Sequence, residues 1–237
     1  MKSRKAASVA KSPEILGFLG GAAKDYIGAR VLLNARLPVQ GAILASTAIE
    51  KYFKTVMAFR GNSSCGHLKK AHWNSVKNFI PGIFADLNPN FLRLLQRCYE
   101  MRYPDTLRFG FNLVIASREF LAELDHTALS IHYGFGLKRD EEYVGTEIET
   151  YRKEKDERLL ANNHVLSGEP KQSFIEAATQ LVYEIRVDPI RGLVEAYYTA
   201  KPSRSNGAFL REGLRPGDKS GMSFDLAFKV LQKQSAT

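Results

Sequence analysis

Residues 38–60 read PVQGAILASTAIEKYFKTVMAFR, and this stretch sets the expected architecture. On a helix, its polar side chains fall in one narrow stripe: Gln40, Thr47, Lys51 and Lys54, with Glu50 beside it. The other positions are apolar or small. An apolar surface much wider than about 100° cannot be covered by a single partner helix. We therefore expect residues 38–60 to form the central helix of a bundle.

Segments on either side supply the other helices that this bundle needs. Ser12-Pro13-Glu14 is a typical helix start, and that helix is expected to run to about Ala35. Apolar residues at helical spacing predict three more helices, within residues 67–80, 89–103 and 118–132. Residues 12–136 are therefore predicted to form an up-and-down bundle of four or five helices.

The pattern changes after Gly136. Residues 146–162 are highly charged and predict one solvated helix, while residues 181–187, 193–200 and 222–230 alternate as strands do. Residues 107–115 also alternate and are expected to join these strands. We predict a mainly α protein: a basic disordered arm (1–11), the bundle (12–136), and an α+β extension (137–237) with a small antiparallel sheet.

The charge is unevenly distributed along the 237 residues. Residues 1–126 hold 18 Lys and Arg against 9 Asp and Glu, whereas residues 127–237 hold 16 of each, so the net charge of +9 lies in the first half. Such a surplus attracts polyanions, which favours nucleic acid or nucleotide phosphate as a partner. The alternative is an ordinary basic protein.

The two cysteines bear on localisation and metals. Cys65 and Cys98 are far apart and lack the spacing of a zinc site. So few thiols indicate a reducing compartment, and no apolar run is long enough for a membrane span. We expect a cytoplasmic protein with no cofactor, no metal and no membrane contact.

Two short blocks carry the candidate chemistry. EKYFK (50–54) places a carboxylate and an ammonium four residues apart on the polar edge of the central helix, where a simple ion pair is the alternative. EMRYPD (100–105) lies at the end of the fourth helix, where Arg102 could instead satisfy the last carbonyl groups.

In combination with other short blocks, these two resemble the HEPN family over residues 12–132. The further blocks, in the same order as in the family, are Asp25-Tyr26, Ala29-Arg30, Ala48-Ile49-Glu50-Lys51-Tyr52 and Gly66-His67-Leu68. The resemblance implies a bundle of four or five helices that is usually dimeric. Many HEPN domains are ribonucleases of toxin, defence or RNA-processing systems. Others are noncatalytic, nucleotide- or RNA-binding partners of small nucleotidyltransferases, and Arg102-Tyr103-Pro104-Asp105 is similar to that group.

The resemblance also yields a candidate binding site. The residues expected to contact RNA or nucleotide phosphate are Arg30, Glu50, Lys51, Lys54, Arg102, Tyr103 and Asp105. Arginine and lysine side chains suit phosphate oxygens because they donate charge-assisted hydrogen bonds.

The same comparison raises doubt about catalysis. Catalytic HEPN members carry an Arg followed by four to six residues and then a His, and Arg102 matches that Arg, but Arg108 and Phe109 stand where the His would be needed. Cleavage of RNA without a metal needs a base such as His to take the 2′-hydroxyl proton. His67 could be that base only if the fold brings it near Arg102. Arg158 and His164 fit the spacing but lie outside the matched region.

Three functions follow from these patterns. The favoured one is a noncatalytic, dimeric protein of a toxin–antitoxin or defence system that binds RNA or nucleotide phosphate, with a nucleotidyltransferase as candidate partner. The second is a metal-independent endoribonuclease in which Arg102 acts with His67, or Arg158 with His164. The third is a protein-interaction module that acts through the extension, residues 137–237.

Overall fold

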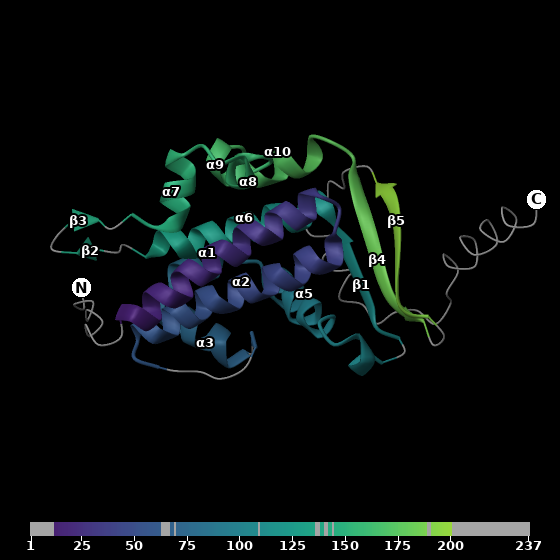
Figure 1. Ribbon diagram of the computed structural model, residues 1–237, viewed down its shortest axis with the longest axis horizontal. Coiled ribbons are helices and arrows are strands. Elements are labelled where there is room, and N and C mark those ends of the chain that lie inside the picture. Colours follow the sequence, from purple (N-terminus) through teal and green to yellow (C-terminus); the bar gives the residue numbers. More distant parts are fainter. Residues whose placement is uncertain are drawn as a thin grey trace, which may run out of the picture.

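The computed structural model describes residues 12–62, 67–68, 70–108, 110–135, 138–139, 142–143, 145–188 and 191–200. Among them the chain is mainly helical and carries a three-stranded antiparallel sheet at one end (Figure 1), which confirms the expected fold class. The basic arm at residues 1–11 and the strand expected at 222–230 lie outside the described residues.

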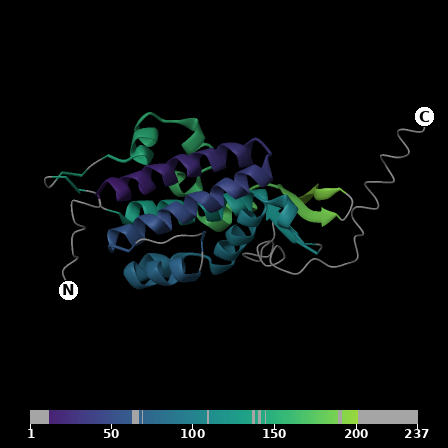
Figure 2. The same cartoon turned by 60° about the horizontal axis from the view of Figure 1, so that its bottom comes forward.

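The bundle is built around α2, as its thin polar edge predicts. The bundle helices are α1 (Ser12–Asn34), α2 (Pro38–Phe59), α3 (Lys70–Phe79), α5 (Pro89–Glu100) and α6 (Ser117–Gly134), with a short α4 (Pro81–Asp86) that the sequence patterns did not predict. The helices α1, α3, α5 and α6 all contact α2, and Figure 2 shows α1 and α2 lying side by side along their length.

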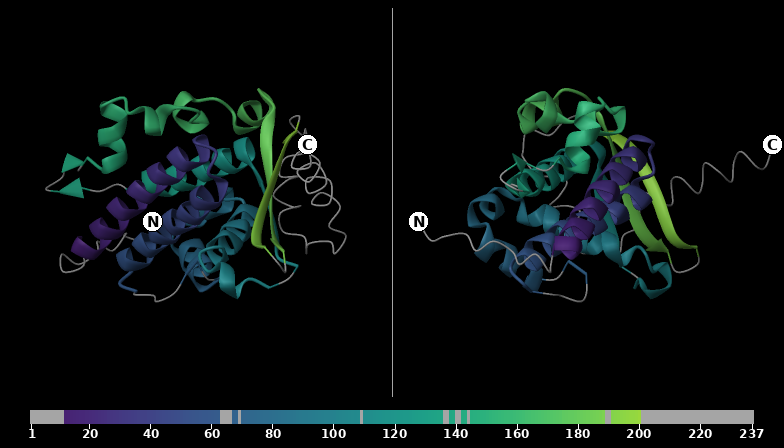
Figure 3. Two further views of the ribbon diagram at one scale, coloured as in Figure 1. Left: turned by 45° about the vertical axis from the view of Figure 1, so that its right-hand side comes forward. Right: turned by 60° about the vertical axis from the view of Figure 1, so that its left-hand side comes forward.

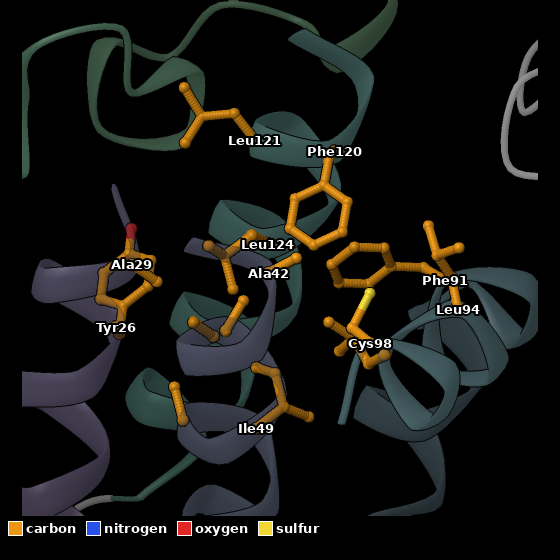
Figure 4. Packing of buried hydrophobic residues seen from close by; sticks show 14 of the residues in the cluster. Tyr26, Ala29, Ala42, Ile49, Phe91, Leu94, Cys98, Phe120, Leu121 and Leu124 are labelled. Atoms are coloured by element: carbon orange, nitrogen blue, oxygen red, sulfur yellow. The ribbon is translucent and has the colours of Figure 1, made fainter. Parts of the chain in front are cut away.

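The core fills the space between these helices. Ile49 of α2 is fully buried, and the rings of Phe91 on α5 and Phe120 on α6 meet edge to face, 5.2 Å apart (Figure 4). Each fully buried large apolar side chain contributes about 1.5–3 kcal/mol to folding. The burial of α2 on nearly every side therefore holds the bundle together.

The charged stretch after the bundle differs from the expected single helix. It divides into α7 (Glu147–Lys153) and α8 (Glu157–Leu160), because Lys155 takes a left-handed conformation (φ 56°) and the Asp156 side chain then accepts a hydrogen bond from the backbone N–H of Arg158. α9 (His164–Ser167) and α10 (Lys171–Glu176) follow, and these short helices contact α1 and α6 (Figure 3). Two short strands, β2 (Lys138–Arg139) and β3 (Glu142–Tyr143), pair ahead of α7.

The sheet joins the two parts of the chain. β1 (Asn112–Ala116) pairs antiparallel with β4 (Gln180–Asp188), and β4 pairs antiparallel with β5 (Gly192–Ala200), which confirms the expected hairpin and the added strand.

The start of β1 was predicted wrongly, at residue 107 instead of Asn112. All five residues of β1 are buried: Leu113 and Ile115 belong to the main core, while Val114 and Ala116 pack with Val182 in a second cluster. β1 therefore has no solvated face, and the alternation of polar residues lay mostly in the preceding loop.

A buried polar network ties the bundle to the segment that follows it. Arg30 of α1 is fully buried, forms an ion pair with Asp125 of α6, and donates to the backbone carbonyls of Arg158 and Ala161. The Tyr26 hydroxyl donates to Asp125 (2.8 Å). Burial raises the pKa of the Asp125 carboxyl, whereas the Arg30 guanidinium opposes this rise. The expected boundary at residue 136 stays a prediction, although hydrogen bonds cross it.

We expect Arg30→Met to lower the free energy of unfolding by about 3–5 kcal/mol, because it leaves the buried Asp125 carboxylate without its partner. Urea denaturation measures the loss. Lys24→Ala is the matched control: it removes an exposed pair with Glu147, and such pairs contribute about 1 kcal/mol or less. Equal stability of the Arg30→Met variant and the wild type would contradict this account.

A second buried group, the His132 imidazole, makes the stability of the fold depend on pH. His132 of α6 is almost fully buried: its Nε2 lies 2.8 Å from Thr146 Oγ1 and its Nδ1 lies 3.3 Å from the Tyr52 hydroxyl. Loss of hydration lowers its pKa to about 4, while the Glu149 carboxylate opposes this shift. The other titratable groups that face it are Tyr133, on its own helix, and Glu147, which lines the same small pocket.

We expect wild-type stability to fall as pH drops from about 6.5 towards 4, because the unfolded His132 takes up a proton in this window and the folded one does not. From pH 7 to pH 5 the loss is about 2 kcal/mol. The measurement is urea denaturation of the wild type and His132→Gln at both pH values. The wild type should lose more stability than the variant, and equal losses would rule out this role for His132.

Candidate functional site

A series of side-chain contacts starts at Glu50, on the polar edge of α2. The carboxylate of Glu50 is buried, with its residue only 5% exposed, and it accepts from two groups. Lys54 Nζ lies 2.6 Å from Glu50 Oε1, one helical turn along, and His67 Nδ1 lies 3.2 Å from Glu50 Oε2. A buried carboxylate is costly unless it is paired and hydrogen-bonded. Glu50 therefore fixes the position of His67, whose side chain remains about half exposed.

The series of side-chain contacts continues from His67 to the end of α5. Tyr99 stacks on the His67 imidazole, with ring centroids 3.9 Å apart, and its hydroxyl lies 2.5 Å from His67 Nε2. The guanidinium of Arg102 lies over the Tyr99 ring, 5.1 Å from its centroid. We call these five residues the His67 cluster: Glu50, Lys54, His67, Tyr99 and Arg102.

Neighbouring core residues hold the cluster in place. Leu68, next to His67, is buried, and its carbonyl accepts a hydrogen bond from the Gln96 side chain on α5. Met101 is likewise buried and anchors the turn that presents Arg102. The Arg102 backbone N–H donates to the Tyr99 carbonyl (3.1 Å). The cluster therefore rests on three separate segments that the core fixes relative to one another.

The Tyr99 phenol and the Glu50 carboxylate each have a defined role in this assembly. Loss of hydration, with the neighbouring Tyr103 hydroxyl, raises the pKa of Tyr99, so the phenol keeps its proton at neutral pH. A carboxylate accepts, so His67 Nδ1–H donates to Glu50, while the Tyr99 hydroxyl lies beside His67 Nε2.

The electrostatics of the cluster favour an anion. Glu50 and Lys54 neutralise each other in a partly buried pair, so the Arg102 charge remains. Among the described residues, no carboxylate is recorded in an ion pair with Arg102, whose side chain is exposed. A guanidinium presents several donors in one plane, which matches phosphate oxygens.

The structure brings together several of the predicted site residues but not all. Glu50, Lys54, His67 and Arg102 belong to the cluster, and Tyr103 meets Tyr99 at a ring-centroid distance of 6.3 Å. Asp105 lies just beyond, in the exposed turn η2 (Pro104–Thr106).

Two predicted binding residues have other partners. Arg30 is fully buried in the network with Asp125, so it cannot reach a ligand at the surface, and the expectation for it was wrong. Lys51 pairs with Asp25 of α1 (2.7 Å), which holds its ammonium against the neighbouring helix.

The two residues of the alternative catalytic pair, Arg158 and His164, also have other partners. Arg158 is exposed and pairs with Asp156 in its own turn. His164 is buried, and its two ring nitrogens lie 3.1 Å from the Ala122 carbonyl and 3.2 Å from the Glu169 carbonyl. Both side chains are therefore engaged in local structure.

Tyr99 is the one cluster residue that the sequence analysis did not select for either binding or catalysis. It lies three residues before Arg102 and four before Tyr103, spacings that place all three on one side at the end of a helix. That spacing could have identified it. Its contact with His67 had no signal in the sequence, because the two residues are 32 positions apart.

Other observations limit the kinds of site in this part of the molecule. Within the described ranges, no group of three or more His, Cys, Asp or Glu side chains is placed to hold a metal ion. Nor does any helix in those ranges have the length and apolar character needed to cross a membrane.

A scan against protein-family models, a search of curated proteins and a search of solved structures each gave no match to this chain.

Proposed function

We propose that the chain binds the phosphate groups of RNA or of a nucleotide at the His67 cluster. The observation that carries this proposal is the position of Arg102 against Tyr99, next to a histidine held by Glu50. An exposed guanidinium beside an aromatic face suits a ligand that combines phosphate with a planar base. The excess of positive charge in residues 1–126 supports the same class of ligand.

The proposed partners, biological role and location rest on the resemblance to HEPN domains in residues 12–132. It supports a homodimer, a small nucleotidyltransferase as protein partner, a role in a toxin–antitoxin or defence system, and a cytoplasmic location. These elements belong to the proposal, and the contacts of the cluster are compatible with them.

Cleavage of RNA without a metal is the second candidate, and the Glu50–His67 hydrogen bond is what favours it. A carboxylate that accepts from Nδ1 orients a histidine as a general base at Nε2. In the present arrangement that nitrogen lies 2.5 Å from the Tyr99 hydroxyl. A 2′-hydroxyl would have to displace the phenol before His67 could take its proton, which is why binding without cleavage is the first proposal.

Arg102→Ala should weaken binding of a labelled single-stranded RNA about tenfold and reduce the slope of log affinity against log salt by about 1, since one phosphate contact is lost. Fluorescence anisotropy at several salt concentrations measures both. Arg93→Ala is the matched control, because Arg93 is likewise an exposed arginine, but it lies on α5 outside the His67 cluster and donates a hydrogen bond to Asn90. If both variants bind like the wild type, Arg102 does not hold phosphate.

Incubation of the protein with labelled RNA in EDTA separates binding from cleavage. On the binding proposal the RNA stays intact with the wild type, with His67→Ala and with Arg102→Ala. Cleavage that is present in the wild type and lost in both variants would replace the binding proposal with the ribonuclease. Arg93→Ala should retain any genuine activity and so exposes a contaminating nuclease.

A further inference from the structure

A hollow of about 550 Å³ lies beside the His67 cluster, at the C-terminal end of α5. Aromatic side chains from three segments line it: Tyr99 on α5, Tyr103 in the turn, and Phe111 just before β1. Leu107 adds an aliphatic wall, and the charged residues in the lining are Glu100 and Arg108. Its volume falls in the range of small-molecule sites, about 300–1,000 Å³.

The walls favour a flat ring system. Bases of single-stranded nucleic acids stack on Tyr and Phe side chains, whichever base is present. Tyr103 is half exposed and its ring meets that of Tyr99 at 63°, so a planar ligand can lie against one ring and touch the edge of the other. Phe111 has the Arg97 guanidinium 5.1 Å from its ring centroid, which fixes it as a wall of the hollow.

Tyr99 connects this hollow to the proposed phosphate site. It lines the hollow and also carries the Arg102 guanidinium. A ligand that uses both sites therefore has a planar group next to an anionic group, as a nucleotide has.

Glu100 adds a preference among the bases. An ionised carboxylate only accepts hydrogen bonds, so it favours a base edge that presents two adjacent N–H donors. Guanine offers N1–H and N2–H side by side on its Watson–Crick edge. Adenine and cytosine offer only an amino group there, with an acceptor beside it, and uracil offers a single N–H between two carbonyls.

We propose that this hollow binds the guanine base of a single-stranded RNA or of a free nucleotide, with Glu100 accepting from its N1–H and N2–H. The inference rests on the proposed function, since it names the base that accompanies the phosphate at Arg102. Tyr103 supplies the stacking surface, and Glu100 supplies the selectivity.

Uracil octamers with one central G, A, C or inosine test the base preference by anisotropy. The G-containing octamer should bind about tenfold more tightly than the A-containing one, as for one bidentate contact of about 1–3 kcal/mol. In Glu100→Gln the ratio of G to A affinity should fall to about threefold or less. Inosine, which lacks the N2 amino group, should fall between G and A.

Two controls separate a loss of base preference from a change in net charge or a loss of folding. Glu100→Gln also removes a negative charge and so strengthens RNA binding in general, but the ratio of G to A affinity is insensitive to that change. Glu157→Gln removes one negative charge from the exposed start of α8, and its ratio should equal that of the wild type. Both Glu100 and Tyr103 are exposed, so their substitution leaves the core intact, and thermal unfolding by circular dichroism verifies this.

Guanosine and pyrophosphate separate the two proposals. Guanosine has no phosphate, so its binding, followed by saturation-transfer NMR, should be lost in Tyr103→Ala and kept in Arg102→Ala. Pyrophosphate binding, followed by phosphorus-31 NMR, should be lost in Arg102→Ala and kept in Tyr103→Ala. Guanosine binding without pyrophosphate binding would sink the phosphate site and leave the base site standing. Equal affinity for all four octamers, or no guanosine binding, would overturn the guanine proposal.

Discussion

The burial of α2 on nearly every side is the constraint on which the structure depends. Its apolar surface is too wide for one neighbour, so α1, α3, α5 and α6 all pack against it. This arrangement leaves one narrow edge where polar side chains meet solvent or each other. Glu50, Lys51 and Lys54 all lie on that edge. The position of the candidate site is therefore a consequence of how the core is formed.

Glu50 links this packing to chemistry. A carboxylate at the border of the core needs partners, and it finds one on its own helix, Lys54, and one from a distant segment, His67. Tyr99 occupies the other side of His67 and supports Arg102. The hydrogen bonds that stabilise Glu50 thus also place a histidine, a phenol and a guanidinium together at the surface. The same contacts therefore contribute to stability and form the proposed ligand site.

Charged residues of this chain fall into two classes. Arg30 and Asp125 are buried and join α1 to α6 and to the segment around residue 160. Arg102 is exposed, with its guanidinium over the Tyr99 ring. Both arginines were predicted to contact the ligand, yet only Arg102 is exposed. The sequence alone could not distinguish them, because burial depends on the packing of α6 and the loop after α8.

The sequence by itself determined the helical bundle, the central place of α2 and the hairpin of β4 and β5, because these follow from periodicities of 3.6 and 2 within single segments. It also identified Glu50, Lys54 and Arg102 as candidates. Only the tertiary structure decided that His67 meets Tyr99, since contacts between distant segments leave no periodic signal. It likewise decided that Arg30 is structural and that the charged stretch after residue 146 breaks at Lys155 instead of forming one helix, because buried partners and caps outweigh local propensity.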